Sequence, residues 1–131
     1  MGSQGKNVLI LDSAPEFLIA LEHVLEEEGF NTTTTWNTGE AIALLSSRQF
    51  NVVLVGEHPP EVKGEEVLKA LQSRRSIPCI VLQATTRNPF EAEHLSSLGA
   101  YAVIPKQRIK EVMDKLRQSL EDPQGTSASA A

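Results

Sequence analysis

Four pairs of residues that contain a polar side chain stand at the ends of short apolar segments. They are Asp12-Ser13, Gly56-Glu57, Gln83-Ala84 and Pro105-Lys106. A carboxylate in such a position can act as a nucleophile. A carboxylate, an amide and an ammonium group together, as in Asp12, Gln83 and Lys106, supply polar contacts for a small ligand. Without a metal ion between them, the acid and the lysine are also natural ion-pair partners.

The sequence pattern offers few other chemical groups. His23, His58 and His94 are isolated, and no cluster of His, Asp or Glu has the spacing of a metal site. The turn after Asp12 has no glycine, whereas a nucleotide-binding turn needs several. Cys79 is the only cysteine, so the chain can form neither an internal disulfide nor a multi-cysteine zinc site.

Short apolar segments rich in β-branched residues alternate with stretches of helical period. Strands are predicted over residues 8–11, 31–36, 52–55, 80–82 and 101–104. Between and after them, apolar residues recur at three- and four-residue spacing, which predicts five helices. This alternation predicts an α/β fold with a doubly wound parallel sheet and helices on both faces. The four polar pairs then meet at the carboxyl edge of the sheet, where such folds bind ligands.

Composition and charge narrow the class of protein. The 131 residues suit one domain, and 40% apolar with 22% charged residues is typical of a globular chain. The net charge of -5 disfavours binding to nucleic acid, which is itself a polyanion. No apolar segment approaches the ~20 residues of a membrane helix. Because the first residues also lack the pattern of a secretory signal, we expect a cytoplasmic location.

The folded unit is predicted over residues 7–121. Residues 1–6 are rich in Gly, Ser and Gln, which predicts an N-terminal tail. Residues 122–131, DPQGTSASAA, are small and polar, which predicts a flexible C-terminal tail or a linker.

Over residues 7–121 the sequence resembles the receiver domains of two-component response regulators. VLILDSAP is similar to the first strand of that family with its acidic end, and FNTTTTWNTGEA to the second strand and its turn. FNVVLVGEHPPEVKG resembles the segment with the phosphoacceptor, CIVLQA the fourth strand, and LGAYAVIPK the stretch with the family lysine. The resemblance implies a flavodoxin-like (βα)5 fold with strand order 2-1-3-4-5.

The resemblance also implies a chemistry. Receiver domains accept a phosphoryl group on an aspartate at the end of the third strand, with the help of a divalent ion. In the family this ion is held by the acceptor, by the second of two adjacent acids after the first strand, and by a backbone carbonyl. A Ser or Thr after the fourth strand and a Lys after the fifth bind the phosphoryl oxygens.

The chain departs from this pattern at the positions that phosphoryl transfer requires most, the acceptor and an acid that binds the ion. The acceptor position is Gly56, which has no side chain to phosphorylate, and the second acid is replaced by Ser13. Both side chains that would hold the ion are missing, so we expect Mg2+ binding to be weak or absent. Gln83 replaces the hydroxyl residue, whereas Asp12 and Lys106 match the family.

Each unusual position has a structural explanation beside a functional one. Ser13 followed by Ala-Pro-Glu fits a capping box, which predicts a helix N-cap rather than a metal ligand. Asp12 is either a leftover carboxylate or the partner of Lys106. Gly56 either permits an unusual backbone angle or a close approach of a loop, or marks relaxed demand at an inactive site. Trp36 is either an exposed anchor for a partner or a lid over the pocket.

Glu57 is the second acid at this edge of the sheet. Through a bulge it would enter the pocket and imitate a charged acceptor. Strand alternation, however, points Glu57 away from the face of Gly56. The sequence therefore favours a solvated loop carboxylate at this position.

These observations predict an atypical receiver domain that is not an enzyme and acts by phosphorylation-independent protein–protein interaction. By resemblance to the family, the surface for a partner, an output domain or a homodimer extends from Phe90 to Leu98 and from Gln107 to Leu120. Two alternatives stay open. One is a receiver that is phosphorylated at Glu57 or Asp12, and the other is a module that binds a small ligand in the vacated pocket.

Overall fold

The computed structural model describes residues 5–58, 61–73, 77–84 and 89–121 as one sheet with helices on both faces. The elements are β1 (Asn7–Asp12), α1 (Pro15–Glu27), β2 (Asn31–Thr35), α2 (Thr38–Ser47), β3 (Val52–Gly56), α3 (Gly64–Ala70), β4 (Cys79–Gln83), α4 (Pro89–Ser97), β5 (Ala102–Pro105) and α5 (Ile109–Glu121). The strands are parallel and lie in the order β2-β1-β3-β4-β5. The predicted flavodoxin-like (βα)5 fold is confirmed. None of the helices in these ranges is both long enough and apolar enough to cross a membrane.

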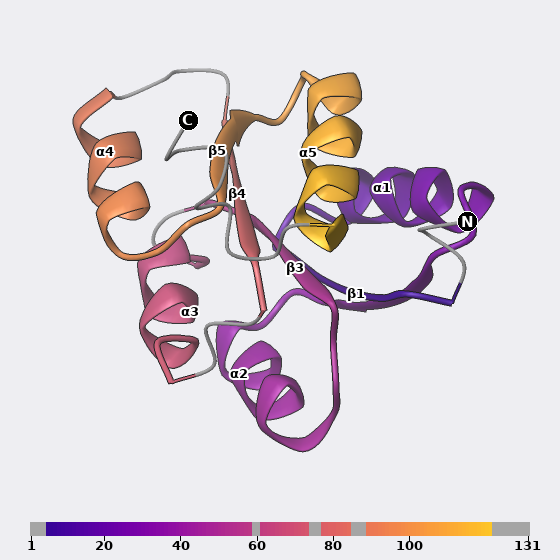
Figure 1. Ribbon diagram of the computed structural model, residues 1–131, viewed down its shortest axis with the longest axis horizontal. Helices are drawn as coiled ribbons and strands as arrows, with labels where there is room; N and C mark the ends of the chain where they lie inside the picture. Colours follow the sequence, from indigo (N-terminus) through magenta and orange to yellow (C-terminus); the bar gives the residue numbers. More distant parts are fainter. Residues whose placement is uncertain (1–4, 59–60, 74–76, 85–88, 122–131) are drawn as a thin grey trace.

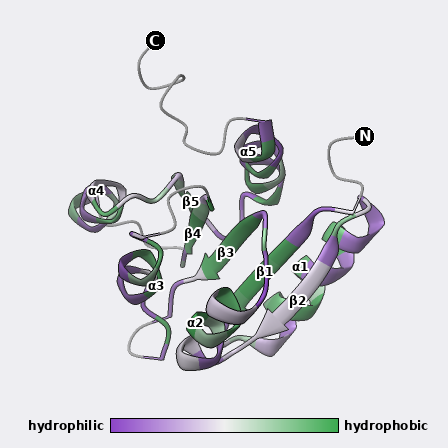
Figure 2. Cartoon of the chain, turned by 60° about the horizontal axis from the view of Figure 1, so that its bottom comes forward, coloured by the Kyte–Doolittle hydropathy of each residue, from purple (hydrophilic) through white to green (hydrophobic). Residues whose placement is uncertain are grey.

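Two apolar cores lie on the two faces of the sheet. The inner strands β1, β3 and β4 are apolar at almost every position, because helices cover them on both sides. Figure 2 shows these strands as hydrophobic and the edge strand β2, with the sequence NTTTT, as pale. One core packs against α1 and α5, and the other packs against α2, α3 and α4. The same division of the helices is visible in Figure 1.

The predicted N-terminal boundary moves by two residues. The backbone N–H of Gly5 donates to the carbonyl of Gly29 at 3.3 Å, and the N–H of Asn31 donates to the carbonyl of Lys6 at 2.8 Å. Residues 5 and 6 therefore join the folded unit through the start of β2. The rest of the predicted N-terminal tail and the predicted tail at residues 122–131 lie outside the described residues.

The predicted N-cap at Ser13 is wrong. Ala14 is the N-cap of α1, with an extended backbone at φ -93 and ψ 105, and Pro15 is the first helical residue. A residue before proline is pushed out of the helical region, so the helix cannot begin at Ala14 as the capping box requires. Asp12 serves this end of the helix instead, because its Oδ1 accepts the backbone N–H of Ala14 at 2.7 Å.

The two helix starts give a testable comparison. Asn37 is the side-chain cap of α2, where its Oδ1 accepts the N–H of Glu40 at 2.8 Å. Asn37→Ala should lower the free energy of unfolding by about 1 kcal/mol. Ser13→Ala should change it by less than ~0.5 kcal/mol, because no cap is lost. Urea denaturation of both variants measures the difference, and equal losses would contradict the assignment of the α1 start.

Candidate functional site

The candidate site lies where β1, β3 and β5 end at the carboxyl edge of the sheet. Asp12 is the last residue of β1, and Gly56 is the last residue of β3 directly opposite it in the parallel register. Strand alternation places both on the face that α1 and α5 cover. Lys106 follows β5, and its backbone N–H donates to the carbonyl of Gln83 at 2.7 Å. Three strand ends thus bring an acid, a glycine and a lysine together.

Asp12 and Lys106 form a buried ion pair, as one of the two interpretations of Asp12 predicts. The Lys106 Nζ lies 2.8 Å from Asp12 Oδ2, and the two side chains are 16% and 1% exposed. This contact is short but is not aligned as a hydrogen bond, so charge attraction dominates it. The same Nζ lies 4.8 Å from the ring centroid of Phe17, which is a cation–π distance.

Gly56 provides the space that Asp12 occupies. A Cβ on residue 56 would lie 1.8 Å from Asp12 Oδ2 and 2.5 Å from its Cγ. Any other amino acid at position 56 would therefore collide with the carboxylate. The described glycines with positive φ are Gly5, Gly29 and Gly99, so Gly56 is needed for space rather than for an unusual backbone angle. The close approach of Asp12 favours the interpretation that position 56 is needed for space over that of relaxed demand.

The residues at this edge do not fit the divalent ion that the family resemblance implies. Mg2+ prefers near-octahedral coordination by several hard oxygen ligands. Position 56 has no side chain, position 13 is a serine, and the carboxylate of Asp12 is already neutralised by Lys106. Within the described ranges, no group of three or more His, Cys, Asp or Glu residues could hold a metal ion.

Three other predicted residues do not join the ion pair. Ser13 is half-buried in the short link between β1 and α1. Gln83 is buried at the end of β4, where alternation places its side chain on the face of Val81, and its backbone carbonyl binds Lys106. Trp36 is 72% exposed, which favours the partner-anchor interpretation over a lid.

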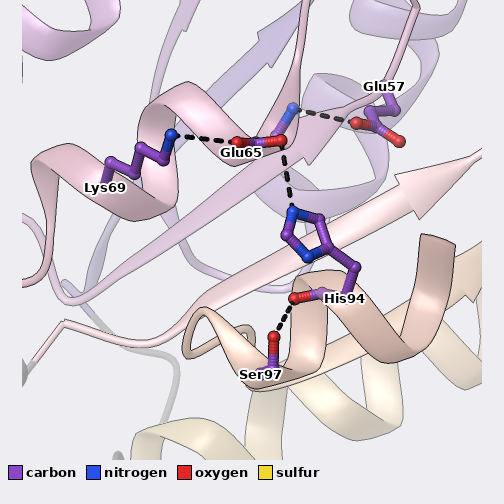
Figure 3. Close-up of polar contacts among 6 residues, drawn as sticks. Glu57, Glu65, Lys69, His94 and Ser97 are labelled. Atoms are coloured by element: carbon purple, nitrogen blue, oxygen red, sulfur yellow. Dashed lines mark hydrogen bonds and ion pairs between the residues drawn. The ribbon is translucent and has the colours of Figure 1, made fainter.

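Glu57 is buried, so the interpretation as a solvated loop carboxylate is wrong. Its residue exposure is 6%, and its Oε2 accepts the backbone N–H of Gly64 at 3.1 Å (Figure 3). Desolvation by burial raises the pKa of the Glu57 carboxyl above its ordinary value, and the charges of Glu91 and Glu65 act in the same direction. The hydrogen bond from Gly64 opposes this shift only in part. Strand alternation correctly predicted that the side chain of Glu57 points away from the face of Gly56. It did not predict that this side chain is buried.

Glu65 connects α3 to α4. Its Oε2 lies 2.9 Å from the Nζ of Lys69 on the same helix, and its Oε1 lies 3.3 Å from the Nε2 of His94 on α4 (Figure 3). The hydrogen bond and charge of Lys69, followed by the contact with His94, lower the pKa of the Glu65 carboxyl. The prediction that His94 is isolated is wrong, because its partner Glu65 lies 29 residues away along the chain.

The space between Gly56 and Asp12 gives a testable coupling. Gly56→Ala should push the carboxylate of Asp12 away from Lys106 and lower the free energy of unfolding by about 1 to 3 kcal/mol. Asp12→Ala removes the colliding oxygens and leaves only a Cβ at 3.1 Å. In that background Gly56→Ala should cost clearly less in urea denaturation. Additive losses in the double variant would show that the two positions are independent.

The buried carboxyl of Glu57 gives a prediction with a defined sign. The pKa of Glu57 is raised in the folded protein. Its contribution to the free energy of unfolding is therefore favourable at acid pH and is lost as the pH rises through that pKa. Glu57→Gln removes the charge, while the amide oxygen still accepts the N–H of Gly64. The variant should therefore gain stability relative to the wild type as the pH rises above about 4.5. Urea denaturation at several pH values measures this gain.

Glu65→Gln is the matched control for that series. The pKa of Glu65 is lowered in the folded protein. Its contribution to the free energy of unfolding is therefore favourable at neutral pH and is lost as the pH falls. Glu65→Gln should be less stable than the wild type at neutral pH, with a difference that shrinks on acidification. The account of Glu57 fails if both variants depend on pH in the same direction.

Known proteins resemble this chain in sequence over most of its length. Residues 8–119 match the family model for the response regulator receiver domain. The response regulator SaeR of Staphylococcus aureus (strain USA300) is 30% identical over 101 residues, which are 76% of this chain and 43% of that protein. The chain thus spans less than half the length of this curated relative.

Solved structures agree with the fold. A receiver domain protein (CheY-like) from Methanospirillum hungatei JF-1 superposes with a TM-score of 0.80 and 26% identity, over 91% of this chain and 96% of that chain. A response regulator from Burkholderia pseudomallei, solved with a phosphorylated aspartic acid, a calcium ion and citrate, has a TM-score of 0.77. It is 20% identical, over 95% of this chain and 74% of that chain, and this likeness supports the fold alone. Because the family model covers almost the whole folded unit, the protein belongs to the response regulator receiver domain family.

Proposed function

We propose that this receiver domain forms no acyl phosphate and acts by phosphorylation-independent protein–protein interaction in the cytoplasm. The supporting observation is the ion pair of Asp12 and Lys106 in the space beside Gly56. Phosphoryl transfer needs a nucleophile, together with positive charge to neutralise the phosphoryl oxygens. Gly56 supplies no nucleophile, and the charge of Lys106 is already matched by Asp12. In this proposal the domain is a signalling module rather than an enzyme.

The alternative acceptors have unfavourable surroundings. The side chain of Asp12 is 1% exposed, with one oxygen on the N–H of Ala14 and the other on Lys106. Glu57 is buried on the opposite face of the sheet, where it accepts the N–H of Gly64. Burial raises the pKa of Glu57 because it disfavours the charged form of the carboxyl. The charged form is the one that would have to attack phosphorus.

The small-ligand alternative meets a similar obstacle. A ligand in the vacated pocket would use the space between β1, β3 and β5. The carboxylate of Asp12 takes up the space beside Gly56, and the Nζ of Lys106 lies between that carboxylate and the ring of Phe17. A ligand would therefore have to separate a buried ion pair before it could bind, which leaves a buried charge without its partner.

We assign recognition of a partner to the surface from Phe90 to Leu98 and from Gln107 to Leu120. Phe90, in the first turn of α4, is 82% exposed, which is unusual for a large apolar side chain. The region of α5 also carries an excess of basic residues, namely Lys106, Arg108, Lys110, Lys115 and Arg117. This charge is partly matched within the chain, because Arg108 pairs with Glu111 and Arg117 pairs with Glu28 and Asp114. The apolar side chain on α4, more than the charge on α5, therefore defines this surface. A protein partner, an output domain and a second copy of the chain are its candidate occupants.

Incubation with acetyl phosphate and Mg2+, followed by intact mass spectrometry, tests the proposed function. The wild-type chain should gain no phosphoryl group, because position 56 has no nucleophile and the nearby acids are buried. A phosphoryl group on most molecules would overturn the proposal.

A restored variant provides the positive control. Ser13→Asp combined with Gly56→Asp adds back both carboxylates and forces Asp12 away from residue 56. This double variant should acquire saturable Mg2+ binding, measured by the fluorescence of Trp36, which follows the strand next to β1. The wild type should show no saturable response under the same conditions. If the double variant also fails to bind Mg2+, the assignment of position 56 to the acceptor site is contradicted.

A further inference from the structure

Of the histidine contacts in the described part of the chain, that of His94 is the one that links two helices. The other two histidines, His23 and His58, contact acids only four and three residues away along the chain. His94 lies on α4, and its Nε2 is 3.3 Å from the Oε1 of Glu65 on α3. The side chains of His94 and Glu65 are 52% and 40% exposed, so solvent protons reach this contact.

A buried acid lies at the start of the same pair of helices. Glu57 follows β3 and binds the N–H of Gly64, the first residue of α3. The charged and titratable groups that interact at this junction come from three elements. Among the described residues they are Glu57 after β3, Glu65 and Lys69 on α3, and Glu91 and His94 on α4. Three carboxylates thus face two basic groups, and Figure 3 shows four of these five side chains.

We propose that the junction of α3 and α4 is a clamp that tightens on acidification. Histidine side chains gain their charge between pH 8 and pH 5. A proton on His94 converts its contact with Glu65 into a charge-assisted hydrogen bond between the helices. Lys69 keeps Glu65 ionised over this range, because it lowers the pKa of that carboxyl.

Glu57 acts in the same direction as His94. Burial raises the pKa of its carboxyl, so Glu57 takes up a proton earlier on acidification than an exposed glutamate does. Loss of its charge removes the repulsion that it exerts on Glu65 and Glu91. Both protonation events therefore favour contact between α3 and α4, and neither breaks the hydrogen bond from Gly64.

The clamp determines how firmly α4 is held to the rest of the domain. Its existence follows from the contacts at the junction and is independent of phosphorylation. Its consequence for partner binding rests on the proposed function, which places Phe90 of α4 on the recognition surface. Acidification would then present Phe90 on a more rigid helix.

Amide hydrogen exchange on the full chain at about pH 7.5 and pH 5.5 tests the clamp, with each rate corrected for intrinsic exchange. The measured quantity is the protection of α4 divided by that of α2, which carries no histidine. In the wild type this ratio should rise about two- to fivefold at the lower pH, the range expected for one partly exposed ion pair. His94→Gln should reduce the rise. His23→Gln, the matched control, should leave it unchanged.

A ratio in the wild type that does not change with pH would overturn the clamp, and so would a full response in His94→Gln. If His94→Gln loosens α4 at both pH values, Glu65→Gln decides the question, because it keeps His94 and removes the charge with which a protonated imidazole would pair. A full response in Glu65→Gln would then contradict the proposal. None of these results bears on acyl phosphate formation, so failure of the clamp and failure of the proposed function are distinguishable.

Discussion

The arrangement of the candidate site depends on one buried ion pair, between Asp12 and Lys106. A buried charge is costly unless a partner lies close to it, so each of these residues needs the other. The pair also needs Gly56, because any side chain there would occupy the position of the Asp12 carboxylate. Phe17 completes the surroundings with its ring beside the ammonium group. The ion pair therefore brings together residues from four separate segments, namely a glycine, an acid, a lysine and an aromatic residue.

The two sides of the sheet edge have different chemical character. On the side of α1 and α5, the ion pair is almost completely buried and its charges neutralise each other. On the side of α3 and α4, the acids outnumber the bases, and the environment shifts the pKa values of Glu57 and Glu65 in opposite directions. The first side is therefore suited to holding the strand ends together. The second side is the one that responds to protons, and it is next to α4, where we place the partner surface.

The fold was predictable because continuous apolar strands and periodic helices each carry a strong local signal. The pairing of Asp12 with Lys106 was predictable as an alternative, because parallel strands bring their carboxyl ends together. The rest depended on finer physical effects. Pro15 places the start of α1 one residue later than predicted. The burial of Glu57 at the start of α3 depends on tertiary packing, which the local sequence does not show. The contact of His94 with Glu65 joins segments that are 29 residues apart.

The most direct test of the ion pair is a crystal structure of the protein soaked in a high concentration of MnCl2. The anomalous signal of manganese identifies a bound ion without ambiguity. We expect the Nζ of Lys106 to stay on the Oδ2 of Asp12, and we expect no anomalous peak beside this carboxylate. A manganese ion bound to Asp12, with Lys106 displaced from it, would contradict the account.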